Sequence, residues 1–187
     1  MSDGVDRRDE QTATDPLIGE VIDGRFRIES LLGAGSMGRV YRATQISVGR
    51  DVAVKVLQGE YRSQVDYRKR FFREAKVISG FTHPNIVRLI DFGEPETGNA
   101  YYIVMELIEG VELSALTERG RLDPEFATEI VYQTAAALIE AHDAEILHRD
   151  LKTDNLLLVP PSNGSLEVKV LDFGGAFPLE RGGSRLT

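Results

Sequence analysis

The chain has 187 residues, a length that suits one domain with a hydrophobic core of its own. Hydrophobic residues make up 42% of it and charged residues 28%, which excludes a protein that is disordered throughout. The net charge of -8 argues against a general binder of nucleic acid or anionic membranes, since such proteins gather Lys and Arg on one surface.

In chain order, the first predicted element is a disordered tail over residues 1–16, which is polar and rich in Asp. This tail lacks the apolar centre of a signal peptide, and no stretch of the sequence is apolar enough to cross a membrane. We therefore expect a cytoplasmic location for this segment. This expectation concerns that segment only and says nothing of a membrane span elsewhere in a longer protein.

Strands and one helix are predicted next. Residues 24–56 alternate between apolar and polar side chains, which predicts an antiparallel meander of strands with a Gly-rich turn. An amphipathic helix is predicted over residues 67–81, and the sequence His83-Pro84-Asn85 ends it. Two further strands are predicted over residues 86–90 and 101–105. Together these elements suggest a five-stranded antiparallel sheet with one helix.

Beyond Gly110 the pattern changes to that of a helix. Asp123 is a good N-cap, and Pro124 suits the first position of a long helix. Its apolar residues recur at helical spacing, which predicts a half-buried helix. They are Phe126, Ala127, Ile130, Val131, Thr134, Leu138 and Ala141. Two short apolar runs over residues 156–159 and 166–171 then predict a β-hairpin.

The first candidate site is the turn from Gly33 to Val40, which has the form G-x-G-x-x-G-x-V. Glycines there let backbone N–H groups approach phosphate oxygens, because no Cβ stands in the way. The motif alone also fits an ordinary hairpin. Its strand–turn–strand setting disfavours a Rossmann dinucleotide site, in which the glycines open a helix.

Lys55 ends the apolar strand that begins at Val52. A lone Lys in such a place usually reaches solvent with its ammonium group. A phosphate-binding role is the alternative, and it needs a carboxylate partner for the ammonium. Glu74 in the predicted helix is the candidate for that partner.

The sequence His148-Arg149-Asp150-Leu151-Lys152-Thr153-Asp154-Asn155 matches H-R-D-L-x-x-x-N at every fixed position. So long a match is rare by chance in a short chain, which makes an ordinary polar loop a poor explanation. The tripeptide D-F-G occurs twice, at Asp91 and at Asp172. Only the second copy follows the H-R-D loop, so we assign a metal role to Asp172 and interpret Asp91 as a turn residue at a strand end.

Taken in this order, the motifs resemble those of the eukaryotic-type protein kinase catalytic domain, over Phe26 to Gly174. Lys152 is similar to the Lys of the Ser/Thr branch of this family. The sequence from Leu32 to Tyr41 looks like that of bacterial members.

The resemblance implies an α+β, protein-kinase-like fold. Its N-lobe is expected over residues 17–105, with a five-stranded antiparallel sheet and one helix. A hinge is expected over residues 106–110. A partial, mainly helical C-lobe is expected over residues 111–187, with the catalytic loop and a β-hairpin.

The resemblance also implies an activity, the transfer of the γ-phosphate of ATP to Ser or Thr hydroxyls of a protein substrate with Mg²⁺. By family pattern Asp150 accepts the hydroxyl proton and Lys152 lies near the transferred phosphate. Lys55, paired with Glu74, contacts the α- and β-phosphates. Mg²⁺ is expected on Asn155 and Asp172. The residues expected around the nucleotide are Leu32, Gly33, Ala34, Gly35, Ser36, Met37, Gly38, Val40, Ala53, Lys55, Met105, Glu106, Ile108 and Leu157.

Two further expectations come from the resemblance and from the composition. By family pattern, the row of side chains expected to stack and join the lobes consists of Ile78, Leu89, His148 and Phe173, and ordinary core packing explains Ile78 and Leu89 equally well. No structural metal site is expected, because the chain has no Cys and only 3 scattered His residues.

The sequence departs from the family pattern in three places. Thr153 stands where Pro is usual, and Gly175 stands where an apolar residue is usual. No A-P-E follows Phe177, so we expect the chain to be a fragment that ends inside the activation segment. Both an active and an inactive fragment fit this expectation. The uncovered face of the long helix would then favour self-association or a partner.

Two alternatives remain beside the enzyme. One is an ATP-binding regulatory or pseudoenzyme fragment that acts through partner binding. The other is a small-molecule phosphotransferase of kinase-like fold, which Lys152 disfavours.

Overall fold

The structure is a computed structural model that describes residues 15–35, 38–57, 65–94, 101–160 and 165–173, together with the backbone of residues 177 and 178. The chain forms two compact units. The first consists of Met1–Phe71 and Leu89–Leu107, and the second of Phe72–Arg88 and Ile108–Thr187.

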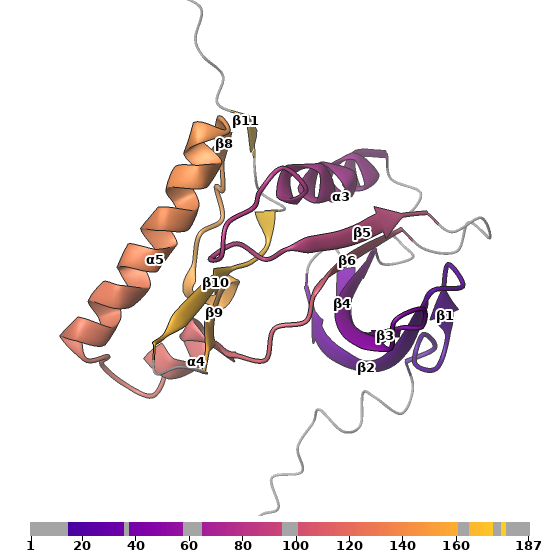
Figure 1. Ribbon diagram of the computed structural model, residues 1–187, viewed down its shortest axis with the longest axis horizontal. Coiled ribbons are helices and arrows are strands. Elements are labelled where there is room, and N and C mark those ends of the chain that lie inside the picture. Colours follow the sequence, from indigo (N-terminus) through magenta and orange to yellow (C-terminus); the bar gives the residue numbers. More distant parts are fainter. Residues whose placement is uncertain are drawn as a thin grey trace, which may run out of the picture. The chain divides into compact units, whose positions relative to one another are not determined.

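The first unit is built on one antiparallel sheet, which curls strongly in Figure 1. Its strands are β1 (Val21–Ile22), β2 (Phe26–Ala34), β3 (Gly38–Gln45), β4 (Arg50–Leu57), β5 (Leu89–Gly93) and β6 (Tyr102–Glu106). Across the sheet the order is β1-β2-β3-β4-β6-β5. The antiparallel sheet predicted from the alternation is therefore present, and the two-residue strand β1 extends it by one strand beside β2.

Side chains alternate between the two faces of this sheet. One face packs into the core cluster of the unit, which is made of Ile22, Phe26, Ile28, Tyr41, Ala43, Val52, Val54, Val56, Tyr102 and Val104. Residues between these positions point to the other face, where Lys55 lies beside Val40 on β3 and Ile103 on β6. The alternation that builds the core thus directs Lys55 away from it.

Asp91 was predicted as a turn residue, but it lies inside β5. Its carboxylate accepts a hydrogen bond from Arg25 in the turn between β1 and β2. Arg25 also donates to Asp23 and to the hydroxyl of Tyr102. One guanidinium therefore joins the β1–β2 turn to β5 and β6, which the curl of the sheet brings near it.

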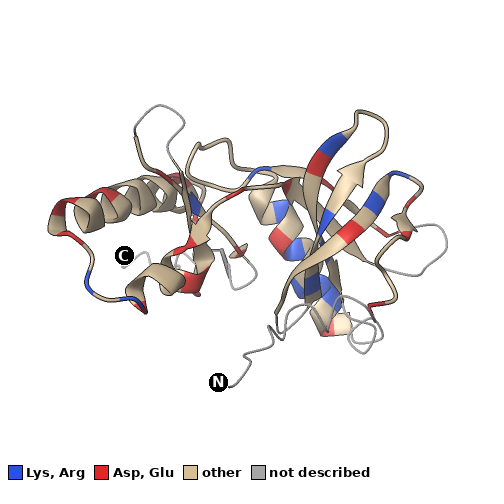
Figure 2. Ribbon diagram, turned by 90° about the horizontal axis from the view of Figure 1, so that it is seen from below, with Lys and Arg blue, Asp and Glu red and all other residues tan. Residues whose placement is uncertain are grey.

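Helix α3 (Val65–Ile78) is the predicted amphipathic helix, placed slightly earlier in the chain than the predicted range of 67–81. Its buried residues are Phe71, Glu74, Ala75 and Ile78. Its exposed residues include four basic ones, Lys69, Arg70, Arg73 and Lys76. Figure 2 shows that Lys and Arg are concentrated on this helix, in a chain whose net charge is negative.

The second unit combines helices with short strands. Its elements are β7 (Val111–Glu112), α4 (Leu113–Thr117), α5 (Pro124–Asp143), β8 (Ile146–Leu147), the 3-10 turn η1 (Thr153–Asn155), β9 (Leu156–Val159), β10 (Glu167–Val170) and β11 (Phe177–Pro178). The predicted hairpin is formed by β9 and β10, and β7 extends it on the β9 side. A second small sheet pairs β11 with β8. In the part of the chain that the structure describes, no helix is long and apolar enough to cross a membrane.

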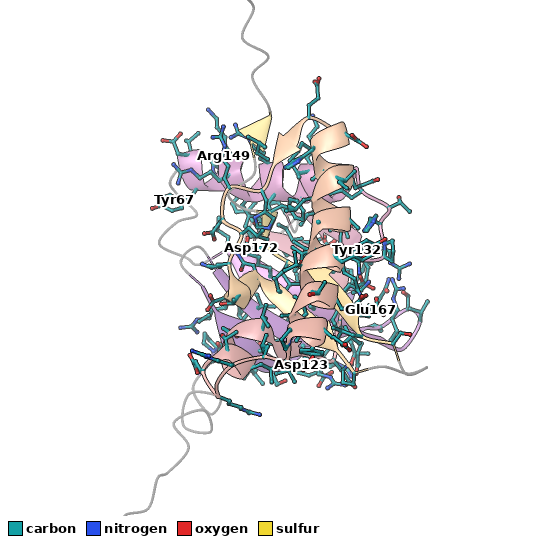
Figure 3. All side chains as sticks on the ribbon, turned by 90° about the vertical axis from the view of Figure 1, so that its left-hand side faces the viewer. Tyr67, Asp123, Tyr132, Arg149, Glu167 and Asp172 are labelled. Carbon is teal, nitrogen blue, oxygen red and sulfur yellow. The ribbon has the colours of Figure 1, made fainter. Side chains whose placement is uncertain are left out.

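Helix α5 begins where the sequence predicts. The carboxylate of Asp123 accepts hydrogen bonds from the N–H groups of Glu125 at 2.9 Å and Phe126 at 3.3 Å. Figure 3 shows Asp123 at one end of the helix. The helix end is thereby capped as the Asp-Pro sequence indicates.

The buried face of α5 differs in part from the prediction. It consists of Ile130, Thr134, Ala137 and Ala141, a row with the spacing of one helix face. Val131 was predicted to be buried but is 67% exposed, because it lies about 100° around the helix from Ile130. Tyr132 is also exposed and is labelled on α5 in Figure 3.

The strand predicted over residues 86–90 is divided between the two units. Its last part opens β5 in the first unit, whereas Ile86 forms a parallel bridge to Val170 of β10 in the second. Val87 donates to the carbonyl of Val170 at 3.1 Å, and Val170 donates to the carbonyl of Asn85 at 2.8 Å. Residues 85–87 thus form an extra edge of the β10 hairpin.

Gln133 on α5 links three segments of the second unit. Its Oε1 accepts hydrogen bonds from Nδ2 of Asn85 and from the N–H of Val168, each at 2.8 Å. Its Nε2 donates to the carbonyl of Leu166 at 2.7 Å. Asn85 also donates to the carbonyl of Val168. One amide on the helix therefore satisfies polar groups of the hairpin and of the segment before β5.

Candidate functional site

The Gly-rich turn connects β2 to β3 as a hairpin. Gly33 is paired with Val40, and Ala34 with Arg39. The N–H of Gly35 donates to the carbonyl of Gly38 at 2.8 Å, which draws the two sides of the turn together. Ser36 and Met37, two of the residues predicted to bind the nucleotide, lie outside the described residues.

The glycines of this turn differ in their surroundings. A Cβ on Gly38 would stand 2.5 Å from the carbonyl oxygen of Val56, so no other residue fits there without a backbone shift. A Cβ on Gly33 would meet no described atom within 4 Å. Gly38 is therefore required by the sheet itself, whereas the open space at Gly33 leaves its backbone accessible to a ligand.

Four of the predicted nucleotide-binding residues share one face of the sheet in the first unit. Lys55 is paired with Val40 on one side and with Ile103 on the other. Ala53, two residues earlier on the same face, is paired with Met105. Val40, Ala53, Lys55 and Met105 are therefore neighbours on the face opposite the core.

Leu32, another predicted nucleotide-binding residue, lies at an irregularity of β2. The register with β3 shifts between Leu31 and Gly33, so Leu32 has no ladder partner, and it is 51% exposed. Glu106 ends β6 in the same unit. Ile108 and Leu157 belong to the second unit, where Leu157 lies on β9 between Lys169 and Glu112. Assembly of all these residues around one ligand stays a prediction.

Lys55 and Glu74 are both buried, with 8% and 1% of their surfaces exposed. Charged residues are rarely buried to this extent without a compensating charge or hydrogen bond. The two residues belong to different units, so the ion pair between them stays a prediction.

The H-R-D loop of the second unit is closed on itself by Asn155, which ends the turn η1 and is buried. Its Nδ2 donates to the carbonyl of Asp150 at 2.7 Å and lies 3.4 Å from Oδ2 of the same residue. Its N–H donates to the carbonyl of Lys152 at 3.1 Å, and its carbonyl accepts from the N–H of Leu171 at 2.8 Å. The loop is thereby tied to the residue that precedes Asp172.

Asn155 has an acceptor that the rest of the described chain does not use. Its Oδ1 accepts no hydrogen bond from any described residue, although only 6% of Asn155 is exposed. A buried oxygen without a donor suits a hard cation such as Mg²⁺, which takes one or two protein oxygens beside those of a substrate. Asp172 follows with φ 54°, a left-handed conformation that Asp tolerates better than most residues. The donor set therefore fits Mg²⁺.

Asp150 remains open to solvent, with about half of its side chain exposed. Nζ of Lys152 lies 3.3 Å from Oδ2 of Asp150 and is equally exposed, so this ion pair contributes little to stability. Asp150 is therefore oriented by its neighbours without being enclosed by them, as a group that accepts a proton from an incoming molecule must be.

His148 joins the loop to the D-F-G sequence. Its Nδ1 lies 3.4 Å from the N–H of Asp150, and its Nε2 lies 3.0 Å from the carbonyl of Leu171, which assigns the ring proton to Nε2. The ring packs at a tilt against Phe173, with centroids 4.6 Å apart and planes at 54°, so this contact of the expected row is present. Phe81, which the sequence did not single out, packs on the same Phe173 ring at 5.2 Å.

Comparisons with known proteins agree on one family. The family model described as "Protein kinase domain" matches residues 26–187. The chain is 42% identical over 160 residues to serine/threonine-protein kinase pkn2 of Myxococcus xanthus, which covers 86% of this chain and 19% of that protein. It is 42% identical over 164 residues to serine/threonine-protein kinase PrkC of Bacillus subtilis, covering 87% and 24%.

A third relative is serine/threonine-protein kinase PknA of Mycobacterium tuberculosis, with 39% identity over 163 residues, 85% of this chain and 37% of that protein. The chain thus spans from 19% to 37% of the length of these curated relatives.

Proposed function

The chain belongs to the protein kinase family, and from that premise we propose that its protein transfers the γ-phosphate of ATP to Ser or Thr hydroxyls of a protein substrate. Such a reaction needs little covalent help, because the enzyme mainly holds two substrates in line and stabilises charge. The observation that carries the proposal is the H-R-D loop, in which Asn155 holds Asp150 and keeps one buried oxygen that accepts no hydrogen bond from the described residues.

In this proposal ATP binds against the face of the sheet that carries Lys55. The backbone of Gly33, Ala34, Gly35, Ser36, Met37 and Gly38 covers its phosphates. Leu32, Val40, Ala53 and Leu157 supply apolar walls for the adenine, with Met105 behind it and the backbone of Glu106 to Ile108 as polar partner. Support comes from the common face of Val40, Ala53, Lys55 and Met105 and from the open space at Gly33.

Lys55 contacts the α- and β-phosphates in this proposal, with Glu74 as its ion-pair partner. The burial of both side chains supports the pairing, since each charge needs compensation in such surroundings.

Asp150 accepts the proton of the acceptor hydroxyl, and its half-exposed carboxylate supports this role. The ammonium of Lys152, 3.3 Å from that carboxylate, lies near the transferred phosphate. Asn155 and Asp172 hold Mg²⁺, which bridges phosphate oxygens and neutralises part of their charge when it is bound. The proposal includes a cytoplasmic location for this segment, where ATP is available to it.

A second candidate is a regulatory protein that binds ATP and acts through a partner. One observation favours it, namely the exposed apolar residues Val131, Tyr132 and Ile139 on α5. Against it, Lys55, Asp150, Asn155 and Asp172 are all present, and proteins that have lost kinase activity commonly lose one of them. Partner binding would use α5, whereas catalysis would use the loop around Asp150.

The test uses the full-length protein with ATP, Mg²⁺ and a generic Ser/Thr protein substrate. We expect turnover of about 1–100 per second. Asp150→Asn should retain ATP binding and lose about 10²- to 10⁴-fold in transfer. Asp154→Asn, an exposed neighbour in the same loop, is the control and should change little. Transfer by Asp150→Asn at the rate of the unsubstituted protein would overturn the proposal, and ATP binding without any transfer would favour the regulatory candidate.

A further inference from the structure

We propose that Asp15 is a positioning residue for the Gly-rich turn, which it holds through Arg39 on the strand that leaves the turn. Nucleotide affinity would then depend on a segment that precedes the matched kinase domain, which begins at residue 26. The inference rests on the proposed function, because it assigns ATP to this turn.

Asp15 is an acidic residue in an enclosed position. Only 1% of its side chain is exposed. Its carboxylate accepts three hydrogen bonds, from the N–H of Leu17 at 3.0 Å, from Nη1 of Arg39 at 2.8 Å and from the hydroxyl of Tyr41 at 3.0 Å. Leu17 and Ile18 pack against the core cluster, so the backbone that carries Asp15 is itself anchored.

The charge states of Asp15, Arg39 and Tyr41 favour strong hydrogen bonds between them. Burial raises the pKa of the Asp15 carboxyl, but the hydrogen bonds from Leu17, Tyr41 and Arg39 outweigh it and hold the pKa below its ordinary value. Burial, together with Asp15, raises the pKa of Tyr41 to about 12, so that its hydroxyl stays a donor. A carboxylate bonded to a guanidinium and a neutral hydroxyl forms hydrogen bonds of the stronger, charge-assisted kind.

Arg39 connects this group to the turn. It follows Gly38 directly and is paired across the hairpin with Ala34. A Cβ on Gly38 would stand 2.5 Å from the carbonyl oxygen of Val56, so the strand lies close to β4 and has little room to move toward it. The Arg39–Asp15 bond holds the same strand from a different part of the chain. Among the described residues, the exit of the turn is therefore fixed on two sides.

Asp15 acts on the turn without touching the nucleotide. Arg39 and Tyr41 alternate with Val40, and Tyr41 belongs to the core cluster, whereas Val40 lies beside Lys55 on the other face. Asp15 therefore approaches β3 from the core side. It can set where the backbone of the turn lies, and it contributes no contact to the phosphates.

A purely structural role is the competing explanation, and Tyr41 separates the two. Arg39 and Tyr41 donate to the same oxygen of Asp15, but only Arg39 adjoins the turn. Loss of either bond should lower stability. Only the loss of the Arg39 bond should change the position of the backbone in the Gly-rich turn.

The experiment compares Arg39→Met, Arg39→Lys, Tyr41→Phe and Asp15→Asn in the full-length protein, with KM for ATP, kcat and the thermal unfolding midpoint as readouts. Arg39→Met and Asp15→Asn should raise KM about threefold to tenfold, since one charge-assisted hydrogen bond is worth about a factor of ten. In both variants kcat should stay unchanged. Arg39→Lys should recover most of the affinity, and Tyr41→Phe should lower the midpoint with KM unchanged.

A matched control is Asp51→Asn, which removes the ion pair of Asp51 with Arg42 on the same strand β3. It should leave KM unchanged. Amide hydrogen exchange of Gly33–Gly38 without nucleotide tests the inference apart from the proposed function. Faster exchange in Arg39→Met but not in Tyr41→Phe supports positioning, even if the protein transfers no phosphate. Equal exchange and equal KM in these two variants would overturn it, and would leave the kinase proposal intact.

Discussion

Asn155 donates a hydrogen bond from Nδ2 to the carbonyl of Asp150 at 2.7 Å, while its Oδ1 accepts none from the described residues. One amide thus supports the proposed base with its nitrogen and offers an oxygen to the proposed metal. We predict that Asn155→Asp keeps the oxygen but loses the donor, and sets a second carboxylate near Oδ2 of Asp150. Phosphate transfer should fall about 10²-fold or more because Asp150 is no longer held in place.

Steady-state transfer at several Mg²⁺ concentrations measures this effect. Asp154→Asn in the same turn is the control, because Asp154 is exposed. Activity of Asn155→Asp that returns to that of the unsubstituted protein at high Mg²⁺ would show that only metal affinity had changed, against the prediction.

The two D-F-G copies give a second prediction. Asp172→Ala should abolish Mg²⁺-dependent nucleotide binding, because it removes a proposed metal ligand. Asp91→Ala should leave that binding unchanged and lower the stability by at most about 1 kcal/mol, because the carboxylate of Asp91 is bonded to Arg25 on a part-exposed surface. Calorimetric titration with and without Mg²⁺ provides the measurement, and equal losses in both variants would contradict the assignment.

Gly38 and Gly33 form a matched pair within one turn. Gly38→Ala should lower the free energy of unfolding by about 1–3 kcal/mol, because its Cβ would press on the backbone of Val56. Gly33→Ala should change it by less than about 0.5 kcal/mol, since the space around Gly33 is open. Chemical denaturation measures both values. A larger loss from Gly33→Ala than from Gly38→Ala would show that the strands pack differently from the structure.

Gln133 supports a prediction about stability alone. Gln133→Leu keeps the approximate size of the side chain but leaves the N–H of Val168 and an Asn85 donor without their acceptor. The expected loss is about 1–3 kcal/mol in the free energy of unfolding. Thr128→Ala, an exposed change on the same helix, should cost less than about 0.5 kcal/mol. Similar values for the two variants would mean that the Gln133 bonds contribute no more than surface contacts.

Alkaline pH should weaken the first unit. Burial is the main cause that raises the pKa values of Tyr41 and Tyr102 to about 12, from an ordinary value of 10.0. Because the pKa of each hydroxyl is higher in the folded state than in the unfolded state, its contribution to the stability of the fold is fully present below the unfolded pKa of about 10. This contribution is lost as the pH rises from about 10 to about 12. Urea denaturation across this range should show the decline. Tyr41→Phe should flatten it, whereas Tyr132→Phe, which removes an exposed hydroxyl, should leave it as it is.

The local parts of the fold could be predicted because their causes are local. Asp123 and Pro124 start α5, and the alternation around Lys55 gives its strand and its face, since capping and alternation act between residues that are close in sequence. The H-R-D loop was likewise assigned from its residues, and the expected contact of His148 with Phe173 is present.

The remaining features depend on partners far apart in the chain. Asp91 lies in a strand and bonds Arg25, 66 positions away, and Ile86 pairs with Val170 of β10 rather than within the first sheet. Val131 was placed on the wrong face because periodicity alone does not tell which side of a broad apolar stripe meets β10. Asp15 was assigned to a tail, since its partners Arg39 and Tyr41 become its neighbours only in the folded sheet.

The pairing of Ile86 with Val170 has a consequence for synthesis on the ribosome. Residues 72–88 belong to the second unit but are made before residues 89–107, which complete the sheet of the first. Residues 85–87 therefore lack their strand partner until β10 has been synthesised. The sheet of the first unit can already form at that stage, because its last strands lie within residues 89–107. A stalled or shortened chain that ends before Val170 would expose Ile86 and Val87 without their strand partner, which makes such intermediates prone to aggregate.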